Sequence, residues 1–411
     1  MTKADNAIAP ASQAWGAGSA SGKAAERKRR LPTFSYLDQY AKRRIPGFAY
    51  DFLDGGTGEH LGALHNRNAL DAVQIVPRYG QPAPVHTDVQ LFGRNYAQPI
   101  GISPVGVDAL VWPGATALMA KAAHAARIPY ITGTLASASL EEVARLCPNG
   151  AWLQLYGLPN DNHRVTFDLI DRADKAGIHA LVATMDAPVR SKRPRDMRNG
   201  LVVPFRPKVR TVWQVVTSLP WAFALLRHGS PRFANIERYV SGTATQAETA
   251  GFVQREIKGT FDWETVKRMR DRWDKALVVK GILHPADAER AVSIGVDGIL
   301  VSNHGGRQSD AAPPAIDMLP IVSNAVGSRA TVLFDSGIRS GLDIARAIAL
   351  GADCAFSGRG FLLGLAALGD EGAEYVADMF ADELRTAMAQ FGAHNFDALR
   401  NASIRHSSRW Q

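Results

Sequence analysis

Residues 298–310 of the 411-residue chain, GILVSNHGGRQSD, contain the pattern that decides the fold. The first four residues suit a strand that is buried on both faces, and this run stops abruptly at Ser302. An imidazole (His304), two glycines and a guanidinium (Arg307) follow directly. Reactive side chains placed just after a buried strand are typical of folds in which parallel strands build a site at their carboxyl ends.

The same arrangement recurs along the chain from Pro99 onward. Short apolar runs end in polar or glycine residues, and an Ala-rich helical pattern follows most of them. Eight such units predict an α/β fold of the closed (β/α)8, or TIM-barrel, type. An open, doubly wound sheet is the alternative, but SPVGV stands where that fold usually has a glycine-rich turn. The expected strands span residues 99–106, 129–135, 151–156, 180–186, 276–282, 298–305, 331–338 and 354–359.

The segments outside this rhythm set the expected domain organisation. Residues 1–30, rich in Ala, Ser and Gly, predict a disordered tail, and a barrel domain is expected over 31–400, followed by a C-terminal tail at 401–411. Two short helices and a hairpin before the first strand are expected to cap the lower end of the barrel. A long insertion, 189–260, follows the fourth strand, and a connection of this length is usually functional or mobile.

Composition and motifs exclude several classes of function. The net charge of +8 is concentrated in ERKRR and in residues 189–210, without the interleaved aromatic residues of a nucleic-acid stacking platform, so we expect no nucleic-acid partner. Two cysteines give no disulfide framework and no metal-binding spacing, which favours a reducing, cytoplasmic location. Neither His-Glu-x-x-His nor Gly-x-Ser-x-Gly occurs, so we expect no metal and no acyl transfer.

Polar and glycine residues gather where the expected strands end. In a barrel of this type such residues meet at one rim and build the active site. The loops FDSGIRSG and CAFSGRGFLLG offer backbone N–H groups that suit the phosphate of a cofactor. The strand-end residues are Pro104, Gly106, Thr132, Thr134, Gln154, Tyr156, Thr184, Asp186, Lys280, Ser302, His304, Arg307, Asp335, Arg339, Gly358 and Arg359.

The motifs WLQLY, VKGI, VSNHGGRQ, DSGIRSG and SGRG resemble those of the FMN-dependent α-hydroxy-acid oxidases and dehydrogenases. The resemblance extends over roughly residues 31–400. It implies FMN as cofactor and the oxidation of an L-2-hydroxy acid, lactate-like or mandelate-like, to the 2-oxo acid. A flavin-dependent isomerase on the same barrel is a second interpretation, but it would not need two arginines for a carboxylate.

The resemblance implies four catalytic residues. His304 is expected to remove a proton from the substrate, and Asp186 to orient the imidazole and stabilise its charged form. Tyr156 is expected to donate a hydrogen bond to the substrate. Lys280 is expected to stabilise the negative charge that appears on the flavin when it is reduced.

Substrate binding is expected to depend on arginines and on one departure from the family pattern. Arg307 and Arg193 are expected to hold the carboxylate, although Arg195 lies nearly at the same place. Family members usually carry a tyrosine where this chain has Phe52, and Tyr50 lies on a different helical face. Phe52 therefore favours a substrate with a bulkier or more apolar side chain.

The FMN contacts implied by the resemblance come from nearly every strand end. Lys280 is expected to lie near the flavin ring, and Gln154, Thr184 and Ser302 to contact the ring or its chain. The last two strand ends are expected to hold the ribityl chain and phosphate. Gly133 stands where many members have a serine, which is expected to be a mild change. The expected cofactor residues are Pro104, Val105, Gly106, Gln154, Thr184, Lys280, Ser302, Asp335, Gly337, Arg339, Gly358 and Arg359.

Two features bear on the electron acceptor and on partners. Gly106 favours a dehydrogenase, because oxidases of this family tend to have alanine there. Residues 211–226 are apolar with two tryptophans, and they suit a peripheral contact with the inner face of a membrane, or else packing against another subunit. We expect a quinone or another non-oxygen acceptor, and a homo-oligomer, as this family is commonly tetrameric. An oxygen-using oxidase and a catalytically weakened FMN-binding barrel at a membrane are the alternatives.

Overall fold

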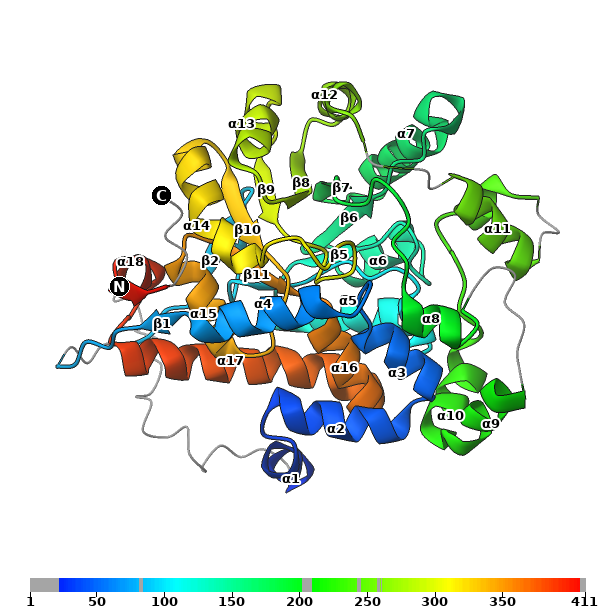
Figure 1. Cartoon of the computed structure of the whole chain (residues 1–411), viewed down its shortest axis with the longest axis horizontal. Coiled ribbons are helices and arrows are strands. Elements are labelled where there is room, and N and C mark those ends of the chain that lie inside the picture. Colours follow the sequence, from blue (N-terminus) through cyan, green and yellow to red (C-terminus); the bar gives the residue numbers. More distant parts are fainter. Residues whose placement is uncertain are drawn as a thin grey trace, which may run out of the picture.

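The eight expected strands form a closed parallel barrel, in agreement with the sequence prediction (Figure 1). The computed structural model describes residues 22–80, 84–201, 209–241, 245–256, 259 and 261–406. The strands follow the order β10-β11-β4-β5-β6-β7-β8-β9 around the barrel. Their bounds are β4 Ile100–Ile102, β5 Tyr130–Thr132, β6 Ala151–Leu155, β7 Ala180–Thr184, β8 Ala276–Ile282, β9 Gly298–Val301, β10 Thr331–Phe334 and β11 Cys354–Ser357.

A helix follows each strand on the outside of the barrel, and side-chain caps explain where some of these helices begin. Ser340 caps α15 through Oγ, which accepts a hydrogen bond from the N–H of Asp343. In α13, Pro285 occupies the first turn and Gly295 ends the helix in a left-handed conformation. The outer helices are α5 Ala115–Ala126, α6 Leu140–Leu146, α7 Asn160–Lys175, α12 Trp263–Arg272, α13 Pro285–Ile294, α14 Ala315–Val326, α15 Gly341–Ala349, α16 Arg359–Leu368 and α17 Gly372–Phe391.

The amino-terminal end of the barrel is filled by aromatic side chains. The hairpin of β2 (Val89–Leu91) and β3 (Arg94–Tyr96) closes this end, as expected. The Trp152 ring lies 5.4 Å from that of Phe92 and 5.6 Å from that of Phe356. A Cβ at Gly101 would lie 2.3 Å from the Phe356 ring, so glycine in this strand makes room for the aromatic filling.

The N-terminal helices lie at the opposite end of the barrel from the one predicted. The expectation that they cap the lower end is wrong, because Phe34 of α2 (Phe34–Arg44) and Phe48 of α3 (Gly47–Asp54) line the cavity at the carboxyl ends of the strands. Long-range contacts hold them there: the Arg67 guanidinium of α4 (Leu61–Ala72) donates to the carbonyl oxygen of Gly337 at 3.1 Å.

Both predicted tails contain regular structure. Gly22–Arg30, inside the tail expected to be disordered, form helix α1, in agreement with the good helix propensity of Ala, Lys, Glu and Arg. Ile404–Arg405 form β12, which pairs with β1 (Gln74–Ile75), and α18 (Phe396–Arg400) precedes it. Residues 1–21 and 407–411 lie outside the described residues, as does part of the basic run, 202–208.

The insertion after β7 forms helices on one side of the molecule (Figure 1). The Gln214 side chain accepts a hydrogen bond from the Phe48 N–H at 3.2 Å, and the Trp221 indole N–H donates to the carbonyl oxygen of Val111 at 3.1 Å. These bonds anchor α9 and α10 to the barrel. The insertion helices are α8 Pro194–Arg198, α9 Val209–Thr217, α10 Leu219–His228 and α11 Gln246–Glu256.

Candidate active site

The carboxyl ends of the strands open into one cavity of about 1890 Å³. It is covered by α2, α3 and the insertion, and each of the eight strands contributes to its wall, either from within the strand or from the residues just after it. Asp186 and Ser302 are absent from the wall, and each lies behind a residue that forms it. The predicted residues that do line it are Phe52, Pro104, Val105, Gly106, Gln154, Tyr156, Thr184, Arg193, Lys280, His304, Arg307, Asp335, Gly337, Arg339, Gly358 and Arg359.

His304 is held between Asp186 and Tyr156. Its Nδ1 lies 2.9 Å from Asp186 Oδ1, and its Nε2 lies 3.4 Å from the Tyr156 hydroxyl. Burial opposes the ionised form of Asp186, but the charges of His304 and Lys280 outweigh it and lower the pKa of that carboxyl. An ionised Asp186 accepts from Nδ1–H, so in the neutral imidazole the lone pair would be on Nε2, on the side of the Tyr156 hydroxyl.

The backbone at His304 adopts a conformation that is rare for a non-glycine residue. Its φ is +57°, and Gly305 and Gly306 continue with φ of +65° and +74°. A Cβ at Gly306 would lie 2.2 Å from the backbone nitrogen of Ala63, so α4 packs directly against this turn. The N–H of His304 donates to Ser302 Oγ at 3.0 Å. The strained turn is therefore supported from both sides, and it directs the imidazole into the cavity.

Lys280 places a buried ammonium group at the cavity wall. Only 4% of the residue is exposed, and Nζ donates to Ser302 Oγ at 2.8 Å and forms an ion pair with Asp335 at 3.3 Å. Burial disfavours the charge, yet Asp335 and Asp186 outweigh it and raise the pKa of Lys280. Ser302, predicted to contact a cofactor, is fully buried, and its Oγ accepts from Lys280 Nζ and from the His304 N–H.

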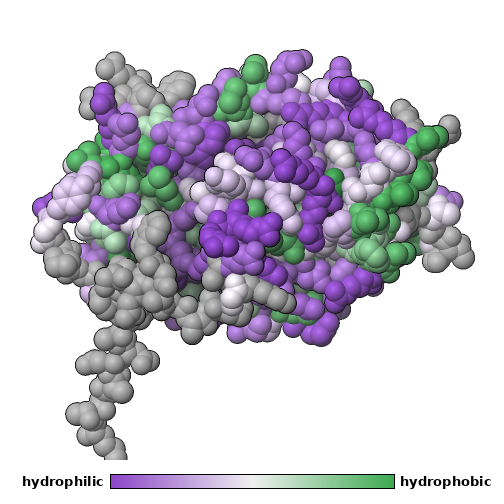
Figure 2. Space-filling model, turned by 90° about the horizontal axis from the view of Figure 1, so that it is seen from below, coloured by the Kyte–Doolittle hydropathy of each residue, from purple (hydrophilic) through white to green (hydrophobic). Residues whose placement is uncertain are grey.

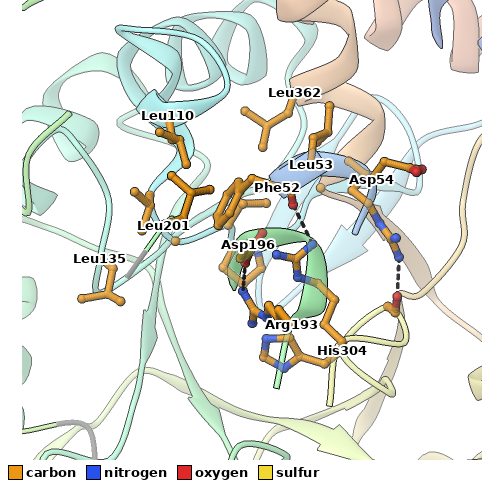
Figure 3. A pocket seen from close by; sticks show the side chains of 18 of the residues that line it. Phe52, Leu53, Asp54, Leu110, Leu135, Arg193, Asp196, Leu201, His304 and Leu362 are labelled. Atoms are coloured by element: carbon orange, nitrogen blue, oxygen red, sulfur yellow. Dashed lines mark hydrogen bonds and ion pairs between the residues drawn. The ribbon is translucent and has the colours of Figure 1, made fainter. Parts of the chain in front are cut away.

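Arg307 and Arg193 both line the cavity, and Figure 3 shows Arg193 next to His304. Arg307 Nη1 donates to the carbonyl oxygens of Phe52 and Gly55 at 3.0 and 2.6 Å, so one edge of the guanidinium is fixed. Arg193 is only loosely paired, 4.0 Å from Asp196. Arg195 is held by Asp54 at 2.7 Å and does not line the cavity, so the geometry favours Arg193 as the cavity residue.

The cavity carries an excess of positive charge. Burial, together with the charges of Arg193 and Arg359, lowers the pKa of Arg307 to about 9. Burial and the charge of Arg339 lower the pKa of Arg359 to about 10. Depressed pKa values of neighbouring guanidinium groups mean that a bound anion would be stabilised here.

The end of the cavity next to β10 and β11 offers donors for a phosphate. Helix α16 begins at Arg359, and its N-cap residue, Gly358, has no side chain to bond the first N–H groups. Gly358 has no space for a side chain, because a Cβ there would lie 2.9 Å from Val105 Cγ2. Arg339 lies over the Phe34 ring at 5.2 Å, which holds its guanidinium beside this end. The donor set therefore suits a singly phosphorylated cofactor such as FMN.

Amide and hydroxyl groups fix the third and fourth strand ends. Gln154 Nε2 donates to Thr184 Oγ1 at 2.8 Å, and Gln154 Oε1 accepts from the N–H of Thr134 at 3.3 Å. These bonds set the orientation of the Gln154 amide at the cavity wall. On the facing side, a Cβ at Gly106 would lie 3.4 Å from Leu135 Cβ, an approach tight enough to press on its neighbour.

Several residues of the site escaped sequence reasoning because their partners are distant in the chain. Ser103, next to the predicted Pro104, donates to Asp335 Oδ2 at 3.1 Å. Ser336 has a φ of +89°, and its Oγ accepts from the N–H groups of Asn303 and Gly305. Both serines carried a signal, because Ser103 lies at the end of the first strand and Ser336 lies within the FDSGIRSG loop.

An apolar wall, formed by Phe52, Leu110, Leu135 and Leu201, faces the arginines (Figure 3). Figure 3 shows the Phe52 ring beside Leu110 and Leu201, with Arg193 next to His304. Tyr50 does not replace the missing hydroxyl, because its OH donates to Asp38 at 2.8 Å and it does not line the cavity. The cavity thus pairs a cationic side with an apolar one.

Helices α9 and α10 present an apolar face to solvent (Figure 2). Within the described ranges, no helix combines the length and apolarity needed to cross a bilayer. The space-filling view shows apolar side chains gathered on the side of the molecule where these helices lie. The apolar face consists of Val212, Trp213, Val216, Leu219 and Phe223, which are 54–68% exposed.

Comparison with known proteins gives extensive matches. The pattern of a family described as FMN-dependent dehydrogenase matches residues 41–406. L-lactate dehydrogenase of Vibrio cholerae serotype O1 is 36% identical over 369 residues, covering 89% of this chain and 96% of that protein. 4-Hydroxymandelate oxidase of Amycolatopsis orientalis is 37% identical over 376 residues, covering 90% and 97%. The crystal structure of the monotopic membrane protein (S)-mandelate dehydrogenase matches with a TM-score of 0.85 and 30% identity, covering 91% of this chain and 99% of that one.

Proposed function

Because this chain belongs to the FMN-dependent dehydrogenase family, we propose that it oxidises an L-2-hydroxy acid with a bulky apolar side chain, of the mandelate type, and delivers the electrons to a quinone. The relatives include dehydrogenases and an oxidase. All of them support the FMN-dependent oxidation of L-2-hydroxy acids, but they do not agree on the electron acceptor, so the choice of acceptor rests on residues of this chain. The observation that carries the proposal is the convergence of Lys280, His304 and Arg307 on one cavity.

The residues around the cavity fit FMN. The uncapped N-terminus of α16, with Arg339 and Arg359, would hold the phosphate, and Asp335 and Gly337 the ribityl chain. Lys280 would lie at the ring, with Gln154, Thr184 and the backbone of residues 104–106 around it. When bound, FMN supplies the acceptor for the two electrons that leave the substrate.

The proton chemistry follows from the orientation of His304. Its Nδ1–H is directed at Asp186, so the proton from the substrate would be taken at Nε2, which faces the cavity and the Tyr156 hydroxyl. Asp186 remains ionised and would stabilise the imidazolium that results. The ammonium of Lys280 would favour negative charge developing beside it.

The carboxylate of the substrate would be held by Arg307 and Arg193. The contacts of Arg307 Nη1 with two backbone carbonyls leave its other donors for a bound anion. Asp196 lies 4.0 Å from Arg193, too far for a close ion pair to compete strongly. Because Phe52 stands in place of a tyrosine, these two guanidinium groups would bind the carboxylate without a tyrosine hydroxyl. The side chain of the substrate would pack against the apolar wall.

The test is anaerobic mixing of the yellow holoprotein with L-mandelate, L-lactate and their D-enantiomers, followed by flavin absorbance. We expect bleaching by L-mandelate at concentrations at least about tenfold lower than by L-lactate, and none by the D-acids. Unchanged colour with every 2-hydroxy acid would support the catalytically weakened flavin binder instead. A preference for L-lactate would contradict the role given to the apolar wall.

Gly106 and the apolar face support a membrane quinone as acceptor. A tryptophan and other apolar side chains on paired helices suit the headgroup depth of a lipid surface. We therefore infer a cytoplasmic enzyme that contacts the inner face of a membrane through α9 and α10. Flotation of the protein with anionic vesicles, before and after Trp213→Ser with Phe223→Ser, measures the contact. Reoxidation of the reduced protein by air as fast as by a quinone would instead indicate an oxidase.

A further inference from the structure

The cavity extends beneath the insertion helices, to residues assigned above to neither the flavin nor the hydroxy acid. Its volume of about 1890 Å³ exceeds the roughly 300–1,000 Å³ that is usual for a site holding one small ligand. The additional part lies beneath the insertion helices. We call it the apolar branch, and its wall includes Val212, Val215, Val216, Leu225 and Val253.

The apolar branch reaches both the substrate wall and the apolar face. Leu110, which belongs to the apolar wall, ends the short helix Asp108–Leu110, and the next residue, Val111, accepts the hydrogen bond that anchors Trp221 of α10. At the outer end, Val212 and Val216 line the cavity and are nevertheless 54% and 57% exposed. The branch therefore opens among the side chains of the apolar face.

A second rim of the same cavity has the opposite character. Arg190 and Lys192 line the cavity and are exposed, and Arg193 follows them toward the imidazole. An ionised hydroxy acid would be attracted along this basic rim, whereas moving its carboxylate through the apolar branch would cost desolvation without a compensating partner. The two rims thus separate a route for an anion from a route for an apolar molecule.

We propose that the apolar branch is the binding site of a lipid-soluble quinone, which enters from the membrane between α9 and α10 and approaches the flavin from the side of Leu110. The inference rests on the proposed function, because it locates the acceptor of that reaction. The overall reaction balances: the hydroxy acid loses two electrons and two protons to become the oxo acid, and the quinone gains both to become the quinol. The apolar lining suits a ring with an isoprenoid tail, and the mouth lies where such a molecule is dissolved.

The test is to fill the branch and measure the two half-reactions separately. Leu225→Trp and Val215→Trp each add an indole to the branch, and Arg227→Trp, at a side chain that is 72% exposed, is the matched control on α10. Holoenzyme in detergent is assayed with a short-tailed ubiquinone and with ferricyanide. We expect kcat/KM for the quinone to fall about tenfold or more in both branch variants, corresponding to about 1.4 kcal/mol, and to be unchanged in the control. Anaerobic bleaching and ferricyanide reduction should remain as in the unmodified protein.

A binding measurement independent of turnover completes the test. An azido-ubiquinone is photo-crosslinked to the oxidised holoenzyme, and the labelled peptides are identified by mass spectrometry. Label within residues 211–225, reduced in Leu225→Trp, supports the site. Quinone reduction that is unaffected by both fillings, or label elsewhere, overturns it while leaving the hydroxy-acid oxidation intact. Absence of bleaching in the unmodified protein would instead refute the proposed function.

Discussion

At its amino-terminal end the barrel is filled by the rings of Phe92 and Trp152, whereas at its carboxyl-terminal end Lys280, His304 and Arg307 surround a cavity. The first end is an interior in the ordinary sense, with side chains in contact and the Trp152 indole N–H bonded to the Tyr96 hydroxyl at 3.2 Å. The second end leaves like charges facing one another across an open space. The same strands therefore contribute packing that stabilises the fold at one end, and at the other end they hold charged groups whose mutual repulsion and burial are unfavourable for folding.

Strained backbone is more frequent around the cavity. Phe92 has a positive φ in the hairpin at the amino-terminal end, whereas Val107, Ser336 and His304 have positive φ at the carboxyl end. Such conformations cost of order 1–3 kcal/mol each and persist only where neighbouring groups enforce them. Here Ser302 and the turn against α4 provide that enforcement. The comparison teaches that changes at the two ends should affect different measurable quantities.

The largest expected effect is at the site itself. His304→Asn retains a residue that tolerates positive φ but removes the base, so anaerobic flavin reduction by L-mandelate should slow by about 10²–10⁴-fold. The thermal unfolding midpoint should be unchanged or slightly raised, because the strain is kept or relieved. Stopped-flow absorbance and scanning calorimetry measure the two quantities. A large loss of stability with normal flavin reduction would contradict the prediction, because it would mean that His304 serves the fold and not the reaction.

A change at the amino-terminal end should do the opposite. Trp152→Ala removes the fully buried indole that contacts Phe92 and Phe356, and we expect the free energy of unfolding to fall by about 3–5 kcal/mol. At a temperature where the variant is folded and loaded with FMN, its rate of flavin reduction should stay within about twofold of normal. Chemical denaturation and stopped-flow measurement on one preparation check both statements. A hundredfold slower reduction would show that the two ends are coupled.

A third prediction concerns pH and a partly buried carboxyl on α17. Glu383 accepts a hydrogen bond from the N–H of Gly341 at 2.7 Å, and burial raises its pKa from 4.5 to about 7. The native state therefore binds more protons than the unfolded state between these values. Its contribution is fully present below pH 4.5 and is lost as the pH rises through 7.

Glu383→Gln should remove this part of the pH dependence and keep an acceptor for Gly341. We expect the unmodified protein to lose on the order of 1–3 kcal/mol relative to the variant between pH 5 and 8. Denaturation curves for both proteins across this range provide the measurement, with flavin reduction at pH 7 as the control for the site. Parallel curves for the two proteins would contradict the assignment.

The sequence predicted the barrel but not how the site is assembled. Each expected strand overlaps an observed one, because apolar runs report burial on both faces, yet 99–106 shortens to Ile100–Ile102 since the residues after it turn into the cavity wall. The position of α2–α4 could not be predicted, because it depends on contacts such as Arg307 with the Phe52 carbonyl, 255 residues apart. The choice between Arg193 and Arg195 likewise depended on Asp54, which only the fold brings near.

The smallest expected effect concerns Phe52, which lies between the cationic side and the apolar side of the cavity. It tests whether this residue acts on the carboxylate or on the side chain of the substrate. Phe52→Tyr adds a hydroxyl to a ring that lies 5.2 Å from the Arg307 guanidinium and beside the apolar wall. One added hydrogen bond to a charged group contributes about 1.5 kcal/mol or somewhat more, so kcat/KM for L-lactate should rise about tenfold. The value for L-mandelate should stay the same or fall, because the wall becomes more polar. Phe34→Tyr, at the Arg339 end of the same cavity, is the matched control. It should change kcat/KM for neither L-lactate nor L-mandelate. An equal gain for both acids would mean that the hydroxyl acts on the carboxylate alone and that Phe52 does not select the side chain.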